Sequence, residues 1–342
     1  MPVAAVAGTL ARMITEAISF DRPGDPDVLI WRPTDLPEPG PGDVVVDVYA
    51  AGVNNADLLQ RQGQYPVPPD APATLGLECS GRLSWVGPQV EGWAVGDAVC
   101  ALLIGGGYAE QVVVPAAQLL PKPQSLTFIE AAALPEALCT VYANLAMTAH
   151  VRRGSSLLVH GGGSGIGTTA IQWGKAVGAR VLTTVGSDWK RDRVLGLGAD
   201  VAVNYRDEDF ATATLRATAG RGVDAILDIV GAPYLRANVD CLAPGGHLVI
   251  IGGRVDGSGR LELGTLMAKR ASVSATMLRP RPKAEKAAVV GGVRREAWPL
   301  VDAGLIVPII DTVLPIRQAA RAHELLTAGR TFGKVVLAVD VP

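Results

Sequence analysis

The sequence has few cysteines, and their spacing excludes two classes of protein. Only four of the 342 residues are cysteines, and Cys79, Cys100, Cys139 and Cys241 stand far apart with no CxxC pair. Disulfide-rich scaffolds and short-spaced structural zinc sites are therefore excluded. We expect all four to be small, buried, unpaired side chains, as is usual for proteins of a reducing cytoplasm.

The chain also lacks an excess of basic charge and a long apolar run. It carries 31 basic and 33 acidic residues, a net charge of −2, so a nucleic acid partner is not expected. Although the chain is 49% hydrophobic, no uninterrupted apolar run reaches the roughly 18 residues that span a bilayer, so a membrane partner is not expected. Residues 1–12 are apolar without a preceding basic region, and we expect an irregular extension rather than a signal peptide.

The remaining pattern indicates an α/β protein of two domains. From Ile30 to about Val114, short β runs are separated by glycine and proline, which is typical of a small, mainly antiparallel barrel. From Gly154 to Leu278, apolar β runs alternate with helical segments, which is typical of a doubly wound parallel sheet. We expect the strands and helix between Ile309 and Val339 to return to the first domain. Gln62–Ala73 and Leu278–Val293 are expected to be loops.

A glycine-rich turn follows the first strand of the second region and leads directly into a helix. With Gly162 first and Gly167 last, the segment has the GxGxxG spacing, except that Ser164 takes the second glycine's place. Such glycines allow a tight turn and a close approach of the backbone to a pyrophosphate, and the helix offers its first N–H groups. We expect a dinucleotide to be bound by Gly162, Gly163, Ser164, Gly165, Ile166 and Gly167.

The end of the second strand indicates which cofactor binds. NAD sites carry a carboxylate there, whereas this chain has Gly186 and Ser187, with Lys190 one helical turn later and Tyr205 after the third strand. Lys190, Ser187 and Tyr205 suit a 2′-phosphate. Asp188 is the counter-argument, and we interpret it as a first-turn carboxylate favoured by the helix dipole. We therefore expect NADPH.

With these residues in hand, the chain resembles the medium-chain dehydrogenase/reductase superfamily, and within it the zinc-independent quinone oxidoreductases. The resemblance is carried by Ala50-Ala-Gly-Val-Asn-Asn-Ala-Asp, Gly76-Leu-Glu-Cys-Ser-Gly-Arg-Leu, Val95-Gly-Asp-Ala-Val, the glycine-rich turn and Gly333-Lys-Val-Val-Leu. The run from Leu58 to Tyr65 is especially close to the branch that contains the p53-inducible quinone oxidoreductase.

The resemblance implies a domain organisation and an assembly. A GroES-like β-barrel catalytic domain is split between residues 1–135 and 279–342, and a Rossmann NADPH-binding domain occupies residues 136–278. A homodimer, often formed through the edges of the Rossmann sheets, is also implied.

The departures from the zinc alcohol dehydrogenases point away from a metal. Where those enzymes have the first zinc cysteine, this chain has Asn54; their Gly-His-Glu is Gly76-Leu77-Glu78, and the third ligand region carries Glu136. A single carboxylate does not hold a catalytic zinc that needs about three protein ligands. The histidines show no ligand spacing, and we interpret them as surface or core residues: His150, His160, His247 and His323.

By resemblance, Asn54 and Tyr65 face the nicotinamide. Tyr65 is a candidate to orient the cofactor or the substrate, or to donate a hydrogen bond to the oxyanion that develops on the substrate. The structural alternatives are that Tyr65 packs on the neighbouring prolines and that Asn54 caps backbone near a turn. Thr140 and Glu136 are further candidates to line the pocket. The sequence offers no convincing general acid, so water is the expected proton source. The resemblance also assigns cofactor contacts to Gly252, Gly253, Leu278, Gly333 and Lys334.

Together these features favour NADPH-dependent reduction of a small-molecule quinone or enone by zinc-independent hydride transfer. Reduction of a conjugated acceptor needs one or two hydrogen-bond donors rather than a Lewis acid. Two alternatives remain open: an enoyl-thioester reductase of the same superfamily, and a non-catalytic NADPH-binding protein.

Overall fold

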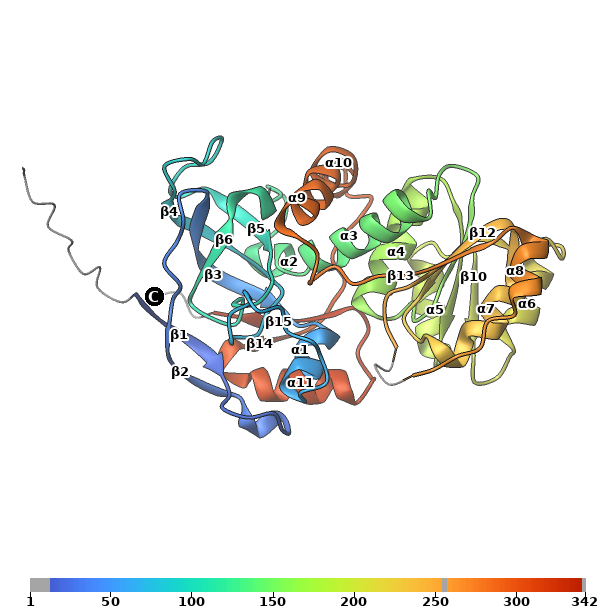
Figure 1. Ribbon diagram of the computed structural model, residues 1–342, viewed down its shortest axis with the longest axis horizontal. Helices are drawn as coiled ribbons and strands as arrows, with labels where there is room; N and C mark the ends of the chain where they lie inside the picture. Colours follow the sequence, from blue (N-terminus) through green and yellow to red (C-terminus); the bar gives the residue numbers. More distant parts are fainter. Residues whose placement is uncertain (1–12, 254–256, 340–342) are drawn as a thin grey trace, which may run out of the picture.

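The computed structural model describes residues 13–253 and 257–339, and the extension predicted at residues 1–12 lies outside them. Two sheets organise the molecule (Figure 1). A barrel-like sheet lies on the left of that view and a parallel sheet on the right, with helices α3 (Pro135–Val141) and α4 (Gly165–Ala176) between them. The predicted α/β class is confirmed.

The barrel-like sheet has seven strands, and every pairing except β14 with β15 is antiparallel. Its strands are β3 (Asp43–Gly52), β4 (Glu78–Val86), β5 (Ala98–Leu102), β6 (Gln111–Pro115), β7 (Leu119–Pro121), β14 (Ile310–Pro315) and β15 (Lys334–Ala338). The hairpin of β1 (Ile14–Ser19) and β2 (Ile30–Asp35) and three helices accompany it: α1 (Asn55–Arg61), α2 (Phe128–Ala131) and α11 (Ala319–Thr327). Because β15 pairs with β3, Val336 opposite Gly52, the predicted return of the C-terminal strands is confirmed.

The second sheet has six parallel strands in the order β10-β9-β8-β11-β12-β13. They are β8 (Ser156–Val159), β9 (Arg180–Val185), β10 (Val201–Asn204), β11 (Val223–Asp228), β12 (Leu242–Ile250) and β13 (Ser272–Ala275). The helices that alternate with them are α4, α5 (Asp188–Gly196), α6 (Phe210–Ala217), α7 (Leu235–Cys241) and α8 (Leu263–Lys269). The strand order reverses between β8 and β11, which is the point where open α/β sheets bind ligands.

The expectation of a loop over Leu278–Val293 is wrong for most of that segment. Residues 283–292 form α9 (Lys283–Gly292), which continues through a π-helical turn into α10 (Trp298–Asp302). Val289 and Val290 of α9 are buried in the same apolar cluster as β8 and α4. Proline at 282 stands just before the helix, where its missing N–H costs nothing, so it starts the helix rather than breaking it.

Two further expectations concern single residues and membrane insertion. All four cysteines are buried and unpaired, as predicted. Among residues 13–253 and 257–339, no helix is long and apolar enough to cross a membrane.

Candidate active site and cofactor site

The glycine-rich turn leads from β8 into α4 with the close packing that its glycines predict. Gly161 has φ +70°, and a Cβ on Gly167 would lie 2.2 Å from the carbonyl oxygen of Gly161. Ser164 caps α4: its Oγ accepts a hydrogen bond of 3.0 Å from the Gly167 N–H. Ser164 also forms a parallel bridge with Gly333, and the Gly333 N–H donates to the Gly163 carbonyl at 2.9 Å. The turn is thereby fixed against the segment that leads into β15.

The other predicted cofactor residues follow the carboxyl ends of neighbouring parallel strands. Gly186 follows β9, Tyr205 follows β10, and Gly252 and Gly253 follow β12. Carboxyl ends of parallel strands meet at one edge of the sheet, so these residues share the edge that carries the glycine-rich turn. Leu278 differs, because its side chain is buried in the apolar cluster around β8 and α4. A contact between these residues and a cofactor stays a prediction.

A cavity of about 290 Å³ lies where the 2′-phosphate was predicted. It is lined by Gly186, Ser187, Lys190 and Tyr205 of the prediction and by Trp189, Arg206, Ala328, Gly329 and Arg330. Arg206 and Arg330 were not among the predicted residues. Arg206 directly follows the predicted Tyr205, whereas Arg330 follows α11 and is brought to this edge only by the fold. The Lys190 ammonium donates to the Gly329 carbonyl at 2.9 Å, and burial lowers the pKa of Lys190. An anion bound in this cavity would raise the pKa of Lys190 back toward its ordinary value.

Asp188, the residue that favoured NAD, does not line this cavity. Its carboxylate accepts one hydrogen bond from the Asn204 amide at 3.2 Å and forms an ion pair of 2.9 Å with Arg191. The exposed carboxylate stands in the first turn of α5, where the helix dipole favours it.

Asn54, Glu78 and Lys334 form a buried network at the start of α1. The Lys334 ammonium donates to the Glu78 carboxylate at 2.5 Å, to Asn54 Oδ1 at 2.7 Å and to the Val53 carbonyl at 3.1 Å. The Asn54 amide in turn donates to Glu78 Oε1 at 2.9 Å. Asn54 therefore engages both ends of its amide with the side chains of Glu78 and Lys334, and a role for it beside the nicotinamide stays a prediction. The Lys334 ammonium is likewise committed there, while its aliphatic stem lies against Gly165 of the glycine-rich turn.

The same network tests whether a catalytic zinc fits. The positions that would supply its ligands hold Asn54, whose amide is already bonded to Glu78 and Lys334, and Leu77, which has no ligand atom. The Lys334 ammonium puts a positive charge beside Glu78, where a second cation would be repelled. No group of three His, Cys, Asp or Glu within the described ranges is arranged to hold a metal ion. The donor set does not fit zinc.

Asp57 connects the start of α1 to the rest of the barrel. Its buried carboxylate accepts hydrogen bonds from the backbone N–H groups of Asn54 at 2.9 Å and Gly76 at 3.0 Å, and from the Tyr108 hydroxyl at 3.2 Å. Burial, only partly offset by these bonds, raises the pKa of Asp57 to about 6. The Tyr108 hydroxyl also lies 3.4 Å from His323 Nε2, so His323 is a core residue, as predicted.

Tyr65, Glu136 and Arg279 meet beside this network. The Arg279 guanidinium lies over the Tyr65 ring, 5.4 Å from its centroid, and its Nε donates to the Ile104 carbonyl at 2.7 Å. Arg279 and Tyr65 both interact electrostatically with Glu136. Thr140, one turn later on α3, places its hydroxyl 3.5 Å from the Glu136 carboxylate. Tyr65, Glu136 and Thr140 were candidates from the sequence, and Arg279 was missed.

The carboxyl group of Glu136 is protonated at neutral pH. Burial first, and the neighbouring Glu78 carboxylate second, raise the pKa of Glu136 from 4.5 to about 8, against the pull of Lys334 and Arg279. Burial and the charge of Glu136 likewise raise the pKa of Tyr65 to about 12, so its hydroxyl keeps its proton. The site therefore contains two neutral proton-bearing groups, one of them a carboxylic acid that the sequence did not reveal as such.

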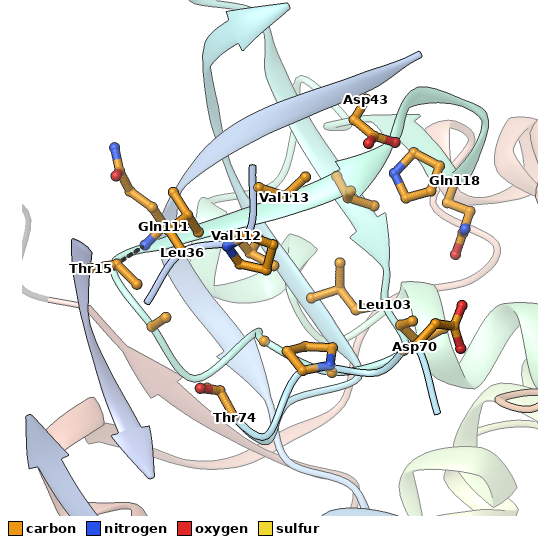
Figure 2. Close-up of a pocket in the computed structure, with 18 of the residues that line it drawn as sticks. Thr15, Leu36, Asp43, Asp70, Thr74, Leu103, Gln111, Val112, Val113 and Gln118 are labelled. Atoms are coloured by element: carbon orange, nitrogen blue, oxygen red, sulfur yellow. Dashed lines mark hydrogen bonds between the residues drawn. The ribbon is translucent and has the colours of Figure 1, made fainter. Parts of the chain in front are cut away.

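A second cavity, of about 190 Å³, lies in the barrel region (Figure 2). Leu36, Leu103 and Val112 form part of its apolar wall, with Thr74 and Gln118 as polar groups. No predicted site residue lines it. Lys286, another lining residue, donates to the Arg279 carbonyl, and Ile104 lines it as well, so the cavity adjoins the segments that hold Arg279.

Two protein-family models match the chain, one in its N-terminal part and one in its C-terminal part. Residues 40–124 match the family described as "Alcohol dehydrogenase GroES-like domain", and residues 197–337 match the family described as "Zinc-binding dehydrogenase". The chain is similar to a quinone oxidoreductase of Pseudomonas aeruginosa, 32% identical over 95% of this chain and 99% of that protein.

A polyketide synthase and an enoyl reductase are similar to the chain as well. A highly reducing polyketide synthase of Emericella nidulans is 33% identical over 96% of this chain, but the chain spans only 12% of that protein's length. Among solved structures, the CurK enoyl reductase superposes with a TM-score of 0.83 at 27% identity, over 95% of this chain and 99% of that one.

Proposed function

The chain belongs to the medium-chain dehydrogenase/reductase superfamily, and from that premise we propose that it is an NADPH-dependent reductase of quinones or related conjugated carbonyls. Members of this superfamily are oxidoreductases that use a nicotinamide cofactor. The choice of NADPH and of a conjugated carbonyl is the step that we add.

The cavity beside Gly186 supports NADPH. Three cations line it, Lys190, Arg206 and Arg330, together with the Tyr205 hydroxyl, while Asp188 is engaged elsewhere. A 2′-phosphate carries the charge that such a cavity attracts, and arginine provides paired donors suited to phosphate oxygens. The glycine-rich turn and the start of α4 would hold the pyrophosphate. When bound, the cofactor supplies a hydride.

The single observation that carries the choice of reaction is what occupies the positions of the zinc ligands. Asn54 and Glu78 bind the Lys334 ammonium there, and Leu77 has no ligand atom, so these residues do not suit a zinc ion. Without a Lewis acid an alcohol is a poor hydride donor. A quinone or enone is a good hydride acceptor, because the electron pair that arrives moves through the conjugated system onto oxygen. In an enone the hydride forms a new C–H bond, and a proton from water or from neutral Glu136 completes the saturated carbonyl product. In a quinone the hydride and one proton together give the hydroquinone.

A second candidate is reduction of an enoyl thioester, which is supported by the similarity to the CurK enoyl reductase and to the polyketide synthase. The chemistry is the same hydride addition to a conjugated carbonyl, so the site's residues suit both substrates. Identity separates the two classes among relatives that are matched over nearly their whole length: the quinone oxidoreductase is 32% identical to this chain and the CurK enoyl reductase is 27% identical. We therefore place quinones and simple enones first.

We also propose that the protein acts as a homodimer, as the resemblance to the quinone oxidoreductases implies.

The experiment that tests the proposed function measures oxidation of NADPH and of NADH with 1,2-naphthoquinone, 1,4-benzoquinone, a simple enone and an enoyl-coenzyme A. We expect turnover of quinone or enone with preference for NADPH. Preference for NADH would overturn the cofactor assignment. Turnover of the thioester alone would favour the second candidate, and tight NADPH binding without any turnover would favour a non-catalytic role.

A further inference from the structure

Arg279 is a buried cation with unused hydrogen-bonding capacity. Its side chain is 3% exposed, and only Nε has an acceptor, the Ile104 carbonyl. Nη1 and Nη2 are buried without a hydrogen-bond partner among the described residues. Leaving donors of a buried charged group unpaired is costly, so such a group is a strong candidate to receive an acceptor from a ligand.

The surroundings place these donors in the candidate active site. The Tyr65 ring covers one face of the guanidinium, with 5.4 Å between its centroid and Cζ, and Glu136 is close enough to interact with both residues. Asn54, the other predicted donor, has its amide engaged by Glu78 and Lys334. At this site Arg279 therefore has two buried donors, Nη1 and Nη2, without an acceptor among the described residues.

The electrostatics favour an oxygen that gains negative charge. The Glu78 carboxylate is already paired with the Lys334 ammonium, and the Glu136 carboxyl group holds its proton at neutral pH. Neither carboxyl group therefore competes for Arg279 as a paired ion. The buried Asp57 carboxylate interacts with Arg279 but is bonded to Asn54, Gly76 and Tyr108. Desolvation lowers the pKa of Arg279, but a guanidinium stays charged at neutral pH. An oxyanion bound beside it would compensate for the cost of removing this charge from water.

We propose that Nη1 and Nη2 of Arg279 bind the carbonyl oxygen of the conjugated substrate and stabilise the negative charge that forms on it. The inference rests on the proposed function. Hydride adds to the conjugated carbon or the quinone, the π electron pair moves to the oxygen, and that oxygen accepts hydrogen bonds from the guanidinium, which keeps its protons. The Tyr65 ring has to shift for the oxygen to reach the donors. Tyr65 then acts as a cover over the guanidinium that the substrate displaces.

The test uses 4-nitrophenol, which resembles a hydroquinone and reports its own ionisation by colour. Bound to the full-length enzyme in the presence of NADP⁺, it should ionise at a lower pH than in water, because Arg279 favours the phenolate. Arg279→Met should abolish this shift and weaken phenolate binding about tenfold or more, and Arg279→Lys should retain part of both. Arg281→Met, a second arginine of the same segment, should behave as the wild type.

The outcomes separate the inference from the proposed function. If Arg279→Met binds the phenolate with an unchanged ionisation midpoint, the inference is wrong, whatever the turnover of quinones. If the wild type reduces quinones or enones but does not favour the phenolate, the inference is also wrong and the proposed function stands. If Arg279 governs phenolate binding but no quinone or enone is reduced, the proposed function fails and the oxyanion site remains. Should Arg279→Met not fold, Arg279→Lys decides by the same titration.

Discussion

Lys334 and Glu78 stand 256 residues apart in the sequence and form an ion pair that water hardly reaches, with exposures of 6% and 0% for the two side chains. Removing two charges from water costs more than an average surface pair returns, so such a pair is stable only when further hydrogen bonds satisfy it. Asn54, Val53 and the backbone N–H of Glu136 provide them. The pair therefore joins β15, β4 and the starts of α1 and α3 in one network.

Breaking this pair from one side should be costly. We predict that Lys334→Met lowers the free energy of unfolding by about 3–5 kcal/mol, because it leaves the Glu78 carboxylate buried and unpaired. The double variant Lys334→Met with Glu78→Gln should lose less than the single variant. Urea unfolding provides the measurement. Lys175→Met is the matched control, since it removes an exposed pair with Asp200 and should cost about 0–1 kcal/mol. Equal losses in Lys334→Met and Lys175→Met would contradict the prediction.

Glu136 should make stability depend on pH. Its pKa rises from 4.5 to about 8 on folding, so the folded protein holds the proton more tightly than the unfolded chain. The stability that this proton provides is fully present below about pH 4.5 and is lost as the pH rises through about 8. Relative to Glu136→Gln, the wild type should lose on the order of 3–5 kcal/mol across this range, as seen in urea midpoints at several pH values.

Glu285→Gln, which changes an exposed glutamate, is the control for Glu136 and should parallel the wild type at every pH. If Glu136→Gln also parallels the wild type, then Glu136 titrates normally and is not a neutral acid in the site.

Tyr65, Glu136 and Thr140 were predictable as candidates from the sequence, but their way of acting was not. The protonated state of Glu136, on α3, depends on burial and on Glu78, which lies on β4. Arg279 was overlooked because an arginine after a strand is ordinary, and only the fold shows that its Nη atoms are buried without partners. Pairings across hundreds of residues are tertiary facts that no local pattern encodes.

At the element scale, the junction of β8 and α4 depends on glycines that backbone atoms surround. A Cβ at Gly167 would lie 2.2 Å from the Gly161 carbonyl oxygen, and a carbonyl in a tight turn has little room to move. We predict that Gly167→Ala displaces the start of α4 and weakens NADPH binding about tenfold or more, as measured by fluorescence titration.

Gly196→Ala gives the matched comparison, because it also replaces a helical glycine but has no atom within 4 Å of the new Cβ. We expect unchanged NADPH binding and a stability equal to or up to about 1 kcal/mol above the wild type. Normal NADPH affinity in Gly167→Ala would show that the close packing does not shape the site.

Elements were predictable where periodicity was strong. The alternation of strands and helices between Gly154 and Leu278 was predicted from apolar runs, and the structure has six parallel strands with helices between them in this region. The helix α9 was missed because Pro280, Pro282 and the glycines at 291 and 292 resemble loop signals. Two buried valines, Val289 and Val290, decide its conformation through packing that lies outside the local sequence.

The proposed phosphate cavity is lined by residues of both the parallel-sheet region and the barrel region. Lys190 and Arg206 come from the parallel-sheet region, and Arg330 follows α11 of the barrel region. A ligand held by both should stabilise the molecule as a unit. At about 100 times its Kd, NADPH should add about 2.7 kcal/mol, seen as a rise in Tm. NADH at the same concentration should add less, because it lacks the 2′-phosphate.

Substitution of both arginines tests the origin of that difference. We predict that Arg206→Ala with Arg330→Ala brings the Tm shift by NADPH down to that by NADH and leaves the shift by NADH unchanged. Arg191→Ala, on the same helix as Lys190 but paired with Asp188, should keep the wild-type difference. A double variant that still prefers NADPH would move the 2′-phosphate away from this cavity.

The parallel sheet also presents an edge that bears on assembly. β13 is its last strand on one side, and no further strand of the described residues pairs there. Three apolar residues in this part of the chain are exposed: Leu263 and Met267 of α8, the helix before β13, by 66% and 73%, and Met277, just after β13, by 41%. Such edges are covered in native proteins, and a second copy of the chain is the occupant that the proposed homodimer provides.

We therefore predict a sedimenting species of twice the 35.5 kDa chain mass. Leu263→Glu with Met267→Glu should yield monomers that still bind NADPH, because both residues lie away from the glycine-rich turn in sequence and do not line the phosphate cavity. Val95→Glu, which places the same charge on an equally exposed apolar residue of the barrel region, should remain dimeric. A monomeric wild type would contradict the prediction, and a dimeric double variant would move the interface elsewhere. The reason is electrostatic: like charges facing each other across a two-fold axis repel, whereas the same charge on a free surface is solvated.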